Sequence, residues 1–178
     1  MHKEHAPWSP LSLSGKVAFS ATAALTTYLN LTGARWVPIV DNANLMFHEA
    51  GHLILGAFSA RLSVYGGTLG QLAFPLIAMG TFARRRESLA LAFASLWLVQ
   101  NLWNISVYLG DAQAQLLPLV GGGDHDWTEI LSRWNALARD QIYSARLREA
   151  GLVLLALVLG FLWKAPARDH PQNDQAPY

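Results

Sequence analysis

The feature of this sequence that most restricts its fold is a series of long apolar stretches separated by short polar segments. The chain has 178 residues, of which 52% are hydrophobic and 14% are charged, whereas about a quarter of the residues in soluble domains are charged. About 20 apolar residues suffice to cross a bilayer as a helix. We therefore predict an all-α, polytopic membrane helix bundle with about five transmembrane helices and a short extramembrane helical segment. Spans are expected near residues 17–33, 42–60, 64–82, 89–109 and 148–165, and a loop with amphipathic helices near residues 111–147.

The length fits a single integral membrane domain over residues 1–178. A triplet of arginines, Arg84 to Arg86, follows the third apolar stretch, and short loops rich in arginine stay in the cytoplasm. Five spans then place the start of the chain outside and its C-terminus in the cytoplasm, as expected in a bacterial inner membrane. A cleaved signal peptide is the alternative for the first stretch, which Lys16 precedes. We favour a retained helix.

Net charge and cysteine content exclude several kinds of partner and site. The net charge of +1 lacks the basic excess expected of a nucleic-acid-binding protein, so the expected partners are the lipid bilayer and a membrane-protein substrate. The chain contains no cysteine, which excludes disulfides and thiolate metal ligands and leaves His, Asp, Glu or water for a zinc ion.

The second apolar stretch contains an HExxH sequence, from His48 through Glu49 to His52. Residues four apart share one helical face, so both imidazoles can bind one metal ion. Glu49 could then take a proton from a metal-bound water. With six histidines in the chain, about 0.006 accidental matches are expected. We predict a zinc site with His48 and His52 as ligands and Glu49 as the catalytic base, against the alternative of two packed histidines and a capped glutamate.

A catalytic zinc site usually has three protein ligands and an open position for water. The candidates for the third ligand are Asp111, Asp124, His125 and Asp126. His52 is expected near the middle of its helix and Asp111 at the end of another, a mismatch on the order of 10–15 Å. Asp126 and Glu129 are expected to cap an amphipathic helix over residues 127–137. A loop through residues 121–123 could instead bring His125 into the bundle. We rank His125 first, Asp111 second and Asp126 third.

The fourth apolar stretch carries a polar stripe that should face the interior of the protein. Its members, spaced three, four and three apart, are Asn101, Asn104, Tyr108 and Asp111. With Gln71, the first three are candidates for contacts to a substrate backbone or a developing oxyanion. Hydrogen bonds between helices are the alternative for the two asparagines. The adjacent glycines Gly66 and Gly67 indicate close helix packing.

These residues resemble the site-2-type intramembrane zinc metalloproteases. The matching pieces are His48, Glu49 and His52 on one membrane helix, then Asn101 or Asn104 with Asp111 two helices later. The resemblance implies an Asp as the third ligand, which corresponds to Asp111. The chain also resembles a group of small uncharacterised bacterial membrane proteins over most of its length, in pieces that include HEAGH, Gly66-Gly67-Thr68, Gln71, Pro75, residues 108–112 and His125-Asp126-Trp127.

The leading functional hypothesis is a zinc-dependent intramembrane peptidase that hydrolyses a peptide bond with a metal-activated water. The first alternative is a membrane zinc hydrolase that acts on a lipid amide or ester, because the same chemistry serves any acyl carbon. The second is a non-catalytic, metal-stabilised membrane subunit.

Overall fold

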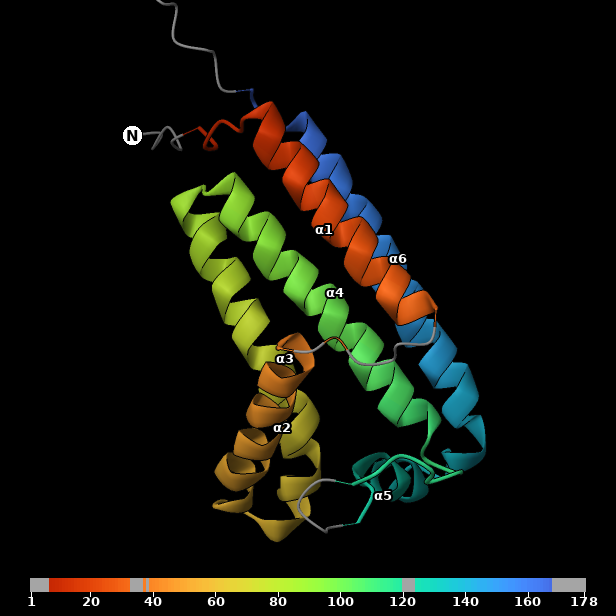
Figure 1. The fold of residues 1–178 in the computed structure, drawn as a ribbon. Helices are drawn as coiled ribbons and strands as arrows, with labels where there is room; N and C mark the ends of the chain where they lie inside the picture. The colour runs from red at the N-terminus through yellow and green to blue at the C-terminus, as the bar shows by residue number, and fades with distance from the viewer. Residues whose placement is uncertain (1–6, 33–36, 38, 120–123, 168–178) are drawn as a thin grey trace, which may run out of the picture.

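The computed structural model describes residues 7–32, 37, 39–119 and 124–167, which form six α-helices (Figure 1). These are α1 (Leu13–Leu31), α2 (Val40–Gly56), α3 (Ala60–Arg85), α4 (Ser88–Gly110), α5 (Asp126–Arg133) and α6 (Asp140–Lys164). A short 3-10 helix, η1 (Leu137–Arg139), precedes α6. The described part of the chain contains no β-strand, only an isolated bridge between Leu11 and Ala167. The predicted all-α class is confirmed.

Helix α4 is the centre of the bundle. It packs against α6 along one side and α3 along another, and α1 contacts both α4 and α6 (Figure 1). The main hydrophobic core lies between α1, α4 and α6 and includes Phe19, Leu96, Val99, Leu155 and Leu162. Helix α6 is continuous from Asp140, so it begins eight residues before the span predicted near residues 148–165.

Helices α2 and α3 approach each other closely because glycines line their contact. A Cβ atom on Gly66 would lie 2.3 Å from the carbonyl oxygen of Gly51, and one on Gly70 would lie 2.5 Å from that of Phe47. Small residues at such contacts bring helix backbones together, which is how membrane helices commonly associate. The predicted role of Gly66 in close packing agrees with this contact.

Two helices of the described residues, α3 and α4, are long and apolar enough to cross a membrane, with mean hydropathies of 1.3 and 1.2. The five spans predicted from sequence are therefore supported only in part. Helix α2 is shorter, at 17 residues, and the first turns of α6 are polar.

The two ends of the described chain lie at the same end of the bundle as the arginine triplet (Figure 1). The backbone N–H of Ser9 donates to the carbonyl oxygen of Arg86 (2.8 Å). The ammonium group of Lys16 is buried and donates to the carbonyl oxygen of Ala165 (2.8 Å), at the C-terminal end of α6. The expected placement of the chain start on the side opposite the arginines is therefore wrong.

The reason is that α1 and α2 each follow only part of α4. Near the end of α1, the amide nitrogen of Asn30 donates to the side-chain oxygen of Gln100 (2.7 Å). Near the start of α2, a carboxylate oxygen of Asp41 accepts from Asn104 (3.2 Å). Gln100 and Asn104 are one helical turn apart, about 6 Å. Helix α2 thus begins at about the position along α4 where α1 ends. Together, α1 and α2 run along the length of α4 once.

The glycine contact between α2 and α3 predicts the effect of one added methyl group. We expect Gly66→Ala to lower the free energy of unfolding by about 1–3 kcal/mol, because the new Cβ would collide with backbone atoms that cannot move aside. Thermal unfolding of the purified protein in detergent measures this. Gly80→Ala in the same helix is the control, since a Cβ on Gly80 meets nothing within 4 Å. Equal stability of the two variants would contradict the packing described.

Candidate metal centre

The two histidines of the HExxH sequence lie on one face of α2. Their ring centroids are 4.7 Å apart, as the spacing of four residues predicts. The space for the rings is provided by Gly67 of α3, because a Cβ there would lie 2.4 Å from the Nε2 atom of His48 and 2.6 Å from that of His52. Of the two adjacent glycines, Gly66 therefore permits the helix contact and Gly67 makes room for the imidazoles.

A carboxylate from α5 completes the group. The Oδ2 atom of Asp126 lies 3.0 Å from the Nε2 atoms of both His48 and His52. All three candidate ligand atoms lie within 4.8 Å of one another. In a tetrahedral zinc site with bonds of about 2.0–2.1 Å, ligand atoms are separated by about 3.3 Å. The two histidines and Asp126 could therefore hold a single ion.

The hydrogen bonding of His52 fits a cation at this position. Its Nδ1 atom lies 2.8 Å from the carbonyl oxygen of Ser63, which can only accept, so Nδ1 carries a proton. In a neutral imidazole the Nε2 atom then holds a lone pair, and this lone pair faces the oxygen of Asp126. A metal ion between these atoms would use both lone pairs, and a backbone carbonyl on the outer nitrogen is a common partner of zinc-binding histidines.

The carboxyl of Asp126 is held ionised where the two imidazoles carry protons. Burial raises its pKa, but the hydrogen bonds and positive charges of protonated His48 and His52 outweigh that effect, so the pKa lies below its usual value. A metal ion would take the place of those protons. The backbone N–H of Asp126 donates to the hydroxyl oxygen of Tyr108 (3.1 Å), which holds the start of α5 against α4.

The roles of His125 and Asp126 are exchanged relative to the sequence prediction. The N-cap of α5 is His125, whose Nδ1 atom accepts from the backbone N–H of Thr128 (3.3 Å). The prediction that Asp126 caps this helix is wrong, because α5 starts one residue earlier than expected. Asp126 is thus the first helical residue, and its carboxylate is free to face the histidines of α2.

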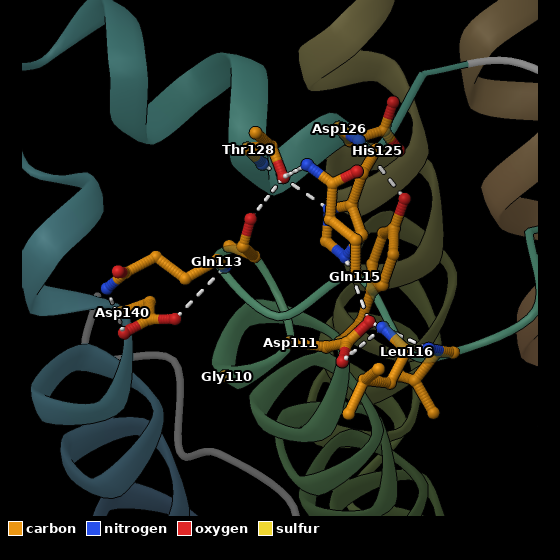
Figure 2. Close-up of polar contacts among 12 residues, drawn as sticks. Gly110, Asp111, Gln113, Gln115, Leu116, His125, Asp126, Thr128 and Asp140 are labelled. Atoms are coloured by element: carbon orange, nitrogen blue, oxygen red, sulfur yellow. Dashed lines mark hydrogen bonds and ion pairs between the residues drawn. The ribbon is translucent and has the colours of Figure 1, made fainter.

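His125 and Asp111, the two higher-ranked candidates for the third ligand, lie close to each other (Figure 2). Neither belongs to the group of His48, His52 and Asp126. The Nε2 atom of His125 is 3.6 Å from Asp111, and burial lowers the pKa of His125 despite the nearby carboxylates. The carboxylate of Asp111 accepts from the backbone N–H groups of Leu116 (3.0 Å) and Leu117 (2.9 Å) and orders the turn after α4. Residues 121–123, expected to deliver His125, lie outside the described residues.

The side chains of His48, His52 and Asp126 line a cavity of about 590 Å³. Glu49 lines it beside both histidines and Asp126, and so do Gln71, Asn104 and Tyr108. Asn101 does not line this cavity: it is fully buried, and its amide nitrogen donates to the carbonyl oxygen of Trp97 in its own helix. At its other end the cavity reaches residues 117–119 and Asp124, after α4.

Sequence reasoning missed three contributors to this site. Ser63 acts through its backbone carbonyl, which leaves no side-chain signal. Gly67 acts through the absence of a side chain. Asp41 lies deep in the cavity wall, and a buried acidic residue beside two asparagines in an apolar stretch was the signal that could have identified it.

Comparison with known proteins adds no assignment: no family, curated protein or solved structure matches this chain.

The geometry predicts how single substitutions change zinc binding. Asp126→Ala should weaken zinc binding more than about 100-fold, because it removes a ligand, whereas loss of an outer-sphere partner typically costs 10- to 100-fold. His125→Asn is the control at the neighbouring position, since asparagine preserves the helix cap. This variant should retain one zinc per chain. Zinc titration with a competing chelator measures both. Loss of zinc only in the His125 variant would show that the ligand set is wrong.

Proposed function

We propose that this protein is a zinc-dependent intramembrane peptidase. The observation that carries the proposal is the His48, His52 and Asp126 group beside Glu49, in a cavity inside a helix bundle. Three protein ligands with an open cavity on the fourth side is the arrangement of catalytic rather than structural zinc sites.

A bound zinc ion would polarise the scissile carbonyl group and lower the pKa of a water molecule. Glu49 takes the proton of that water and passes it to the leaving amine, as a general base and then a general acid. The Tyr108 hydroxyl already accepts from Asp126, so its own hydrogen is free to donate to the developing oxyanion. Gln71 and Asn104 contact the substrate deeper in the cavity.

The exterior of the bundle supports insertion in a membrane. Large apolar side chains more than half exposed occur on four helices, including Leu25, Leu53, Ile77 and Leu157, and exposed apolar surface on this scale is unusual for a soluble monomer. We propose that α3, α4 and α6 each cross the bilayer and that α1 and α2 share one crossing. Broken helices of this kind are tolerated where they line a cavity.

The arginine triplet supports a cytoplasmic C-terminus in a bacterial inner membrane. The N-terminal segment shares that end of the bundle. The metal centre lies beside Tyr108, at the opposite end of α4, so we propose that its cavity opens on the side of the membrane away from the cytoplasm. The substrate is then a membrane-protein segment within or next to this outer half of the bilayer.

Replacement of Glu49 by glutamine tests the mechanism. Glu49→Gln should reduce peptide hydrolysis by about 10²- to 10⁴-fold while one zinc per chain is retained, because the side chain no longer accepts a proton. Cleavage of fluorogenic transmembrane peptides in liposomes is the assay, with Glu87→Gln, which does not line the cavity, as the control. An active Glu49→Gln protein would contradict the mechanism. Activity confined to lipid esters would indicate a lipid hydrolase, and zinc without turnover a non-catalytic subunit.

The absence of cysteine makes the proposed topology directly testable. Single cysteines introduced at the exposed positions Pro10, Leu116 and Ala167 can be labelled with a membrane-impermeant maleimide. In intact cells Leu116→Cys should react, and Pro10→Cys and Ala167→Cys should react only after lysis. Labelling of Pro10→Cys in intact cells would contradict the proposed topology.

A further inference from the structure

The inner end of the cavity contains a branched network of hydrogen bonds that ends at the buried carboxylate of Asp41. The Oδ1 atom of Asp41 accepts from the amide nitrogens of Asn44 (3.3 Å) and Asn104 (3.2 Å). Asn44 in turn accepts from the indole N–H of Trp97 (2.8 Å). Asn104 accepts from the amide nitrogen of Gln71 (2.8 Å).

With Asp41 ionised, the direction of every hydrogen bond in this network is set by the indole N–H of Trp97, which only donates, and by the carboxylate, which only accepts. An indole N–H only donates, so Asn44 must turn its oxygen to Trp97 and its nitrogen to Asp41. The Oδ2 atom of Asp41 accepts from the backbone N–H of Val37. On the other branch, the Oδ1 atom of Asp41 requires the nitrogen of Asn104. The oxygen of Asn104 then requires the nitrogen of Gln71.

One polar atom of the network, the Oε1 atom of Gln71, has no hydrogen-bond donor among the described residues. Gln71 is 3% exposed and lines the cavity. Since one hydrogen of its nitrogen is donated to Asn104, the amide cannot exchange the places of its oxygen and nitrogen. The network therefore gives the cavity a fixed hydrogen-bond acceptor.

Building on the proposed peptidase function, we infer that Gln71 binds a backbone N–H of the substrate and that Asp41 positions it, so that the cavity selects amides over esters. An extended peptide presents an N–H at each residue, whereas an ester has no hydrogen at the equivalent atom. An ester oxygen would face the Gln71 oxygen with lone pairs on both sides and leave a buried acceptor without a partner. Gln71 is thus a specificity-determining residue, and Asp41 acts on the substrate only through Asn104 and Gln71.

The probes are N-acyl dipeptide hydroxamates, whose hydroxamate group binds zinc, and analogues in which each backbone N–H in turn is replaced by an ester oxygen. Calorimetry with the zinc-loaded full chain in detergent gives the ratio of amide to ester affinity at each position. One replacement should weaken binding about tenfold or more, and the others should have smaller effects.

Gln71→Leu should bring that ratio close to one, because the acceptor is removed. Asp41→Asn should lower it as well, since an amide at position 41 lets Asn104 and Gln71 reverse. Asn101→Ala, buried on the same helix as Asn104 but outside the cavity, should keep the ratio, and zinc content is measured for every variant. Equal binding of all analogues by the zinc-loaded protein would overturn the role inferred for Gln71 and leave the proposed peptidase function standing. A protein that holds no zinc and binds no hydroxamate would overturn the proposed function and this inference with it.

Discussion

The contact between the Asp126 carboxylate and the imidazoles of His48 and His52 is the interaction on which the site depends. It joins the short helix α5 to α2 inside the bundle. A buried carboxylate costs free energy unless a positive charge or several hydrogen bonds compensate it. A divalent cation would supply that compensation. The neighbouring residues preserve the contact: Gly67 leaves space for the rings, Ser63 orients one of them, and Tyr108 holds the start of α5.

The broken path of α1 and α2 explains how polar groups reach the interior of an apolar bundle. Because α2 begins beside the middle of α4, Asp41 and the HExxH sequence lie at successive depths along one cavity. The depth mismatch expected from sequence assumed that α2 crosses the whole bilayer. His48 instead packs against Tyr108 near the end of α4, with ring centroids 5.8 Å apart, so Asp126 of α5 reaches it without a distorted helix.

Much of the fold could be predicted from local sequence patterns. Apolar stretches placed both ends of α1 to α4 within four residues, whereas α6 begins eight residues before the predicted last span. The spacing of His48 and His52 placed their rings on one face. The third member of the group could not be ranked correctly in advance, because a one-residue change in the start of α5 exchanges the positions of His125 and Asp126. The path of α1 and α2 depends on contacts such as Asn30 with Gln100, whose distance in sequence leaves no periodic signal.

The central claim is that His48, His52 and Asp126 hold one zinc ion. Anomalous scattering at the zinc edge from crystals of the zinc-loaded protein tests this most directly, because it locates the metal without reference to activity. A single peak within about 2.0–2.2 Å of both Nε2 atoms and a carboxylate oxygen of Asp126 is predicted. A peak between His125 and Asp111, or no peak in the bundle, would contradict the claim.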